Sequence, residues 1–148
     1  MKTLLTQLLA VCTVATLGTS GALAAEGWGD NYEKAAAQAK ADNKLMLLDF
    51  TGSDWCPWCI KLTKEVFSQP EFKYYAAKNL VLMEVDFPQT KPQSAAVKAQ
   101  NERLQNKYGI QGYPTVIVLN SAGKKVGEFG YQPGGPKPVI ATLEQLKK

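Results

Sequence analysis

Histidine is absent from the 148 residues, and cysteine occurs only three times. The lack of histidine excludes Cys–His nucleophilic catalysis and the C-x-x-C-H signal for haem attachment. Structural zinc is disfavoured as well, because such a site usually takes four Cys or His ligands. The charges are scattered, with 17 Lys and Arg against 13 Asp and Glu, and they form no basic stripe suited to nucleic acid. We therefore expect no metal, no cofactor and no nucleic-acid partner.

Long apolar runs are also missing. The stretch from residue 4 to residue 17 is shorter than the roughly 20 apolar residues of a membrane span, and threonines interrupt it. It follows the basic Lys2 and precedes Ala22-Leu23-Ala24, which has the small-x-small form of a cleavage site. Residues 1–24 therefore predict a secretory signal peptide, and no stable membrane span is expected.

Residues 25–148 have the length of one domain, and we expect this single domain to be exported. The absence of an N-x-S/T glycosylation sequon suits a bacterial periplasm. A lipoprotein anchored through Cys12 is the competing interpretation, but the bulky Val11 precedes that cysteine where a small residue is expected. Without Cys12 two cysteines remain, whereas small exported domains usually carry several disulfides. The remaining pair is therefore interpreted as kept for chemistry.

That pair lies in Trp55-Cys56-Pro57-Trp58-Cys59, directly after an apolar run over residues 45–50. A buried strand that leads into a helix would place Cys56 at the helix N-terminus, where unpaired N–H groups and the helix dipole favour the thiolate. Thiol-disulfide exchange is the function that this spacing favours. The alternatives are a Cu(I) site built on the two sulfurs and a structural clip, whose four-residue loop would stabilise the fold by only about 2 kcal/mol.

The turn and cap residues, together with the spacing of the apolar residues, predict alternating helices and strands with a closing hairpin. The helix that Pro57 opens is expected to turn Ile60, Leu62, Thr63, Val66 and Phe67 inward. This order predicts an α/β domain with a small mixed β-sheet and helices on both faces. The expected elements are a helix over 30–42 capped by Asp30, a strand over 45–50, the helix from Pro57, a short helical piece over 70–75, a strand over 80–87, a helix over 94–108, a hairpin of 115–120 with 125–129, and a final helix from Pro136.

The order of elements, the W-C-x-x-C after the first long strand and the segment Gly109-Ile110-Gln111-Gly112-Tyr113-Pro114-Thr115 together resemble thioredoxin. The resemblance extends from about Tyr32 to Leu146 and implies the thioredoxin fold. The sequence of residues 50–56 looks most like that of exported bacterial thioredoxin-like proteins.

Carried over to this chain, the resemblance implies that Cys56 is an exposed nucleophile and Cys59 the shielded resolving thiol. It also implies that Pro114 follows a cis peptide bond and faces the cysteines. The backbone of Tyr113 would then pair with a bound peptide strand. Trp55 and Trp58 would shape the rim of the site and exclude water, although half-buried packing explains either residue equally well.

Asp49 resembles the buried carboxylate of the family, which is proposed to move protons to and from the resolving cysteine. An acid inside an apolar strand is costly to bury ionised, so a raised pKa would fit that role, and a merely structural role is the alternative. The chain departs from ordinary thioredoxin in two ways. One extra residue separates the acid from the first cysteine, and the lysine usual on the neighbouring strand is replaced, at about Leu82.

The direction of electron flow depends on the dipeptide Pro57-Trp58, which is neither the Gly-Pro of reducing thioredoxins nor the Pro-His of strong periplasmic oxidases. Without a histidine in the motif, we expect a reductase or exchange enzyme rather than an oxidase. An isomerase is disfavoured because exported isomerases resemble dimers with an added dimerisation domain. The expected protein is a monomer that acts on protein thiols and disulfides, and an unidentified redox partner resets it.

Overall fold

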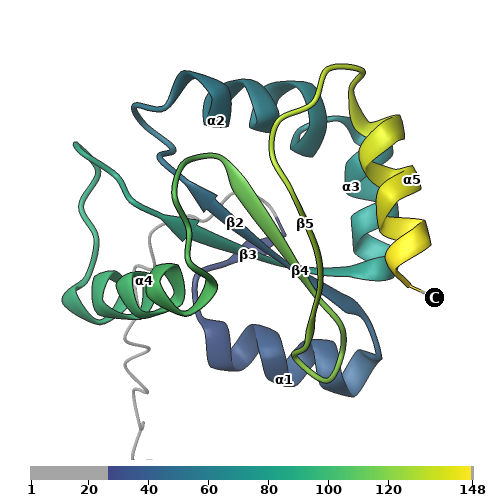
Figure 1. Ribbon diagram of the computed structural model, residues 1–148, viewed down its shortest axis with the longest axis horizontal. Helices are drawn as coiled ribbons and strands as arrows, with labels where there is room; N and C mark the ends of the chain where they lie inside the picture. The colour runs from purple at the N-terminus through teal and green to yellow at the C-terminus, as the bar shows by residue number, and fades with distance from the viewer. Residues whose placement is uncertain (1–26, 148) are drawn as a thin grey trace, which may run out of the picture.

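A computed structural model describes residues 27–147, so the predicted signal peptide and Cys12 lie outside the described residues. Its centre is a five-stranded sheet in the order β1-β3-β2-β4-β5 (Figure 1). Strands β1, β3 and β2 run parallel, whereas β4 is antiparallel to β2 and β5 is antiparallel to β4. The predicted mixed sheet and hairpin are thereby confirmed. The strands are β1 (Trp28–Gly29), β2 (Leu45–Thr51), β3 (Leu80–Asp86), β4 (Thr115–Leu119) and β5 (Lys125–Phe129).

Helices cover both faces of this sheet, as the sequence predicts (Figure 1). One face carries α1 (Tyr32–Asp42) and α4 (Ala95–Tyr108). The other carries α2 (Pro57–Leu62), a π-helical turn η1 (Thr63–Phe67) that continues α2, α3 (Pro70–Asn79) and α5 (Pro136–Leu146). Among residues 27–147, none of these helices has the length and apolar character to cross a membrane.

Strand β2 is the centre of the molecule, because all seven of its residues are buried. Its side chains alternate between the two faces, as in any strand. Leu45 and Leu47 belong to the core under α2, α3 and α5, whereas Met46, Leu48 and Phe50 belong to the core under α1 and α4. Asp49 has the parity of Leu45 and Leu47, so its side chain lies on the α2 face of the sheet.

Local capping explains where most helices begin and end. Ser94 accepts a hydrogen bond from the Val97 N–H and caps α4, which ends at Gly109 in the left-handed conformation, both as predicted. For α1 the prediction is off by one residue. Asn31, not Asp30, is the N-cap, and its side chain accepts from the Lys34 N–H. Asn31 is the cap because its side-chain amide oxygen reaches the Lys34 N–H, which has no partner within the helix.

Two other predictions about elements are wrong, and one short strand was not predicted. Ile60 is 48% exposed and Thr63 is also exposed, because the inward line of the helix passes through Cys59, Leu62 and Val66 instead. The helical piece that starts at Pro70 runs on to residue 79 rather than 75. Strand β1 was not predicted at all, because two residues are too few to show a periodic pattern.

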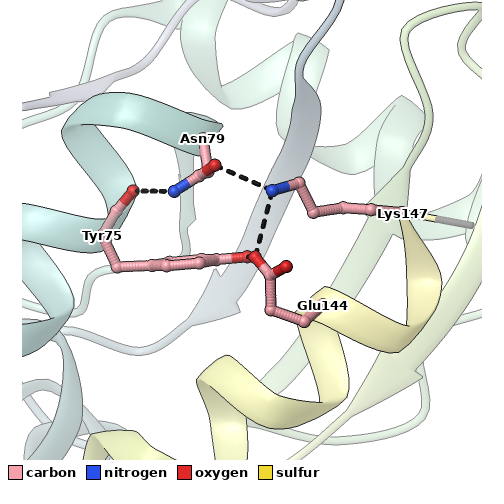
Figure 2. A network of polar contacts seen from close by, with 4 residues as sticks. All are labelled: Tyr75, Asn79, Glu144 and Lys147. Carbon is pink, nitrogen blue, oxygen red and sulfur yellow. Dashed lines mark hydrogen bonds and ion pairs between the residues drawn. The ribbon is translucent and has the colours of Figure 1, made fainter.

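The α3–α5 pair is joined at its exposed end by a polar network (Figure 2). The Tyr75 hydroxyl donates to a Glu144 carboxylate oxygen at 2.5 Å, and Lys147 Nζ lies 3.0 Å from the same oxygen. Lys147 also donates to the Asn79 side-chain oxygen at 2.8 Å. These contacts hold the last turn of α5 against the end of α3.

Candidate functional site

Cys56 and Cys59 are joined by a disulfide at the N-terminus of α2. Cys56 is the N-cap residue, and its Sγ accepts the Cys59 N–H at 3.3 Å. Pro57 occupies the first turn, where a missing N–H costs nothing. The Gly52 N–H points at Cys59 Sγ at 3.5 Å. After reduction these N–H groups and the helix dipole would stabilise a thiolate.

Both cysteines are covered by the surrounding protein. Cys56 is 4% exposed and Cys59 2% exposed. The expected contrast between an exposed and a shielded cysteine is therefore wrong for the disulfide state. The physical reason is the loop before β4, whose Tyr113 carbonyl oxygen lies 3.8 Å from Cys56 Sγ.

This loop carries the predicted proline. The Tyr113–Pro114 peptide bond is cis, and β4 begins directly after it. Thr115 donates from its hydroxyl to the Gly112 carbonyl at 2.8 Å and closes the turn. The two segments that the sequence analysis singled out, 57 residues apart, thus meet at the disulfide.

Trp55 is built into the frame on one side of the disulfide. Its indole N–H donates to the Phe87 carbonyl at 2.8 Å, and its ring meets the Tyr113 ring edge-on at 6.1 Å. Tyr113 in turn stacks on Phe87 at 5.2 Å. Gly52 leaves room for this indole, since a Cβ there would come within 2.4 Å of the Trp55 ring. Trp55 nevertheless remains 39% exposed.

Trp58 lies at the other side of the disulfide and is 55% exposed. Its ring centroid is 5.3 Å from that of Tyr131, and Lys61 Nζ lies 5.2 Å and 5.0 Å from the two centroids. The Tyr131 hydroxyl donates to Glu65 at 2.7 Å. Sequence reasoning missed Tyr131, because it follows β5 and nothing in its local pattern points to α2. Both tryptophans lie at the rim, as expected.

Two aspartates that sequence reasoning did not single out fasten the loop before Cys56. Asp54 accepts the backbone N–H groups of Gln89, Thr90 and Lys91 at 3.0, 2.7 and 3.0 Å, and the Thr90 hydroxyl at 2.6 Å. These hydrogen bonds, that of the Thr90 hydroxyl foremost, hold the pKa of Asp54 well below its usual range. Asp86 accepts the Ser53 N–H and hydroxyl at 2.9 and 2.6 Å. The start of α2 is thus tied to the loop after β3.

Asp49 is 5% exposed, and its Oδ1 has no hydrogen-bond partner among residues 27–147. Burial raises the pKa of Asp49 to about 8, and the charges of Glu84 and Asp86 contribute further. The residue that pairs with Asp49 on β3 is Glu84, whereas Leu82 pairs with Leu47. Leu82, at about which the family's lysine is replaced, is thus two residues away from the register partner of Asp49.

No group of three or more Cys, Asp or Glu side chains within residues 27–147 could hold a metal ion. A soft metal bound to the two sulfurs would therefore find no third ligand of these types in the described part of the chain.

Comparisons with known proteins agree with this geometry. A family model described as a thioredoxin-like domain matches residues 32–147. The chain is 34% identical over 119 residues to "Disulfide bond reductase DsbH" of Chlamydia pneumoniae, covering 80% of this chain and 72% of that protein. It is 32% identical over 110 residues to "Thioredoxin-related protein DsbJ" of the same organism, covering 72% of this chain but only 32% of that protein. A solved structure titled "DsbH Oxidoreductase" superposes with a TM-score of 0.75 at 30% identity, over 88% of this chain and 93% of that one.

Proposed function

This chain belongs to the thioredoxin-like family and is a thiol-disulfide oxidoreductase, and from that premise we propose that it reduces or exchanges disulfides in exported proteins through Cys56 and Cys59. The observation that carries the proposal is the position of the disulfide at the start of α2, with the Tyr113 carbonyl 3.8 Å from Cys56 Sγ. A thiolate at Cys56 would be stabilised and would lie beside a backbone to which a substrate strand could pair.

The reaction has two exchange steps. In the reduced enzyme the Cys56 thiolate attacks one sulfur of a substrate disulfide, and the other substrate sulfur leaves as a thiolate that takes up a proton. Cys59 then loses its proton and attacks the Cys56 sulfur of the mixed disulfide. The Cys56–Cys59 disulfide forms, the second substrate thiolate is released, and two electrons have passed to the substrate. A dithiol partner resets the enzyme by the reverse exchange.

Asp49 is the group that we assign to the proton of Cys59. It lies on the face of the sheet that α2 covers, it is buried, and one of its oxygens is unpaired among the described residues. A carboxyl whose pKa is raised to about 8 can both accept and return a proton near neutral pH. The role of the cis Pro114 is to hold the Tyr113 backbone beside Cys56 without a competing N–H donor.

The dipeptide Pro57-Trp58 supports the reducing direction. It offers no histidine to stabilise the thiolate of the reduced form, which is what makes the disulfide of a strong oxidase so oxidising. The name of the relative from Chlamydia pneumoniae, a disulfide bond reductase, points the same way. The cellular location is proposed from the sequence of residues 1–24: cleavage there would release a single domain, residues 25–148, into a bacterial periplasm, where it would act as a monomer.

The reduction potential of the Cys56/Cys59 couple tests the proposal. The purified protein is equilibrated in dithiothreitol or glutathione buffers, and free thiols are counted, with Cys56→Ser as the variant that cannot form the disulfide. A value near −270 mV would support a reductase, whereas one near −120 mV would mean a disulfide oxidase of the same fold. If no buffer produced the intramolecular disulfide, the redox function would be refuted, and Cu(I) titration of the reduced protein against a competing chelator would follow.

A further inference from the structure

Two carboxyl groups lie side by side on the α2 face of the sheet. Asp49 on β2 and Glu84 on β3 are register partners in a parallel pair, so their side chains point to the same face from strands about 4.8 Å apart. On the other side of Asp49, its register partner on β4 is the apolar Val116. The only carboxyl in direct register with Asp49 among the described strands is therefore Glu84.

The two groups differ in exposure and in hydrogen bonding. Asp49 is 5% exposed, whereas Glu84 is only partly buried and reaches solvent. Within residues 27–147 Glu84 makes no side-chain hydrogen bond. Asp86, the next acid along β3 on this face, uses both oxygens to hold Ser53. Glu84 is thus the neighbour whose charge is not already committed to a structural contact.

The remaining charges around the pair are few. Asp86 and Asp30 add negative charge near Glu84, and Lys91 is the cation that opposes them. Burial is the main cause that raises the pKa of Glu84, but the Glu84 side chain is less buried than that of Asp49. The buried residues of α2, the helix on this face of the sheet, are Cys59 and Leu62. Two adjacent carboxylates in a poorly hydrated site cannot both ionise cheaply.

We propose that Asp49 and Glu84 act as a carboxyl pair that retains one proton, in which ionised Glu84 is a positioning residue that keeps the proton on Asp49. Glu84 thereby sets the pH at which Asp49 becomes a carboxylate able to take the proton from Cys59 Sγ. The reaction step itself moves one proton from sulfur to oxygen and no electrons. The kinetic part of this proposal rests on the proposed function, whereas the proton retained by the pair does not.

The kinetic test uses pre-reduced protein mixed with a disulfide substrate, and follows the rate of the single turnover that forms the Cys56–Cys59 disulfide from pH 5 to pH 10. In Glu84→Gln a neighbouring negative charge is lost, so Asp49 ionises more readily. The midpoint of the rate profile should move down by about one pH unit. Glu84→Lys should move it further in the same direction. Glu102→Gln is the matched control, because it removes the same charge from the exposed surface of α4 on the opposite face.

A double variant separates an effect through Asp49 from a general change in the site. In the Asp49→Asn background, Glu84→Gln should leave the rate profile where Asp49→Asn alone has put it. A further shift in that background, or an unshifted profile in Glu84→Gln alone, would overturn the proposal.

An infrared titration examines the pair without any turnover. The band of a protonated carboxyl should persist above pH 7 in the oxidised wild-type protein, vanish in Asp49→Asn, and titrate about one unit lower in Glu84→Gln. Loss of the band at the same pH in wild type and in Glu84→Gln would refute the pair. If the band behaves as expected but the wild-type protein reduces no disulfide, the proposed function fails and the carboxyl pair stands.

Discussion

Phe50 and Asp49 are neighbours on β2, yet they point to opposite faces of the sheet and meet opposite conditions. Phe50 is fully buried under α1 and α4 among apolar side chains, with the Tyr108 ring edge-on at 6.2 Å. Asp49 is almost as well buried under the α2 layer, but it is a carboxyl with one oxygen unpaired among residues 27–147. Among residues 27–147 the α1–α4 face holds no buried acid, although the buried Tyr108 hydroxyl and the Asn101 side chain show that polar groups occur there too, whereas the α2 face carries the disulfide and a costly acid. One face mainly stabilises the fold, and the other gives up stability for chemistry.

The largest expected effect breaks the stabilising face. Phe50→Ala should lower the free energy of unfolding by about 3–5 kcal/mol, because it removes a fully buried ring and leaves a cavity. Urea unfolding measures this loss. The milder Phe50→Leu should remain folded and keep the wild-type reduction potential. A shifted potential in Phe50→Leu would show that the two faces are not separate in function.

The second prediction concerns the acid on the other face. The pKa of Asp49 is raised to about 8, so the folded protein binds more protons than the unfolded chain between about pH 4 and pH 8. Stability should therefore be highest at the acidic end of this window and fall as the pH rises through it. Asp49→Asn should remove this slope and stabilise the protein at pH 8 by up to about 5 kcal/mol.

Unfolding by urea at several pH values between 4 and 8 measures that slope. Asp42→Asn, at the exposed end of α1, is the matched control and should leave it unchanged. If wild type and Asp49→Asn lose stability in parallel as the pH rises, the buried acid is not the cause.

The smallest effect on stability is expected at the rim of the α2 face. Trp58 is 55% exposed, so Trp58→Ala should change the free energy of unfolding by less than about 1 kcal/mol. An exposed aromatic beside the disulfide can contact a polypeptide substrate, and its loss should lower kcat/KM for a protein disulfide about threefold to tenfold. Glutathione disulfide, which offers less surface for the ring to contact, should lose less of its rate. Tyr74→Ala, an exposed aromatic on α3, is the control, and an equal loss there would contradict a local role for Trp58.

The features of the fold that were predictable are those that neighbouring residues encode. The apolar run of β2, the cap Ser94 and the stop Gly109 each act within one element, and all three are found where the sequence places them. The failures lie where remote segments decide. Ile60 is exposed because α2 turns Cys59 and Leu62 toward the sheet, and the docking of the helix on the sheet, not its apolar pattern, decides which side is buried.

The same division holds for the candidate site. Cys56, Cys59 and Pro114 could be identified because a short motif carries each of them, and the structure brings them together. Asp54 and Glu84 have no motif. Their partners are the loop after β3 and the register neighbour on β2, which only the assembled sheet brings within reach.

Helix α5 is the last element of the chain, and this position matters while the protein is being made. Val139 and Leu143 of α5 belong to the same core cluster as Leu62 and Val66, under the helix that bears the disulfide. A chain that emerges N-terminus first therefore exposes both cysteines long before it can complete the layer that covers this face. Until α5 docks, the cysteines can meet the thiols and disulfides of other emerging chains, so the redox site is most vulnerable to wrong pairing during its own biosynthesis.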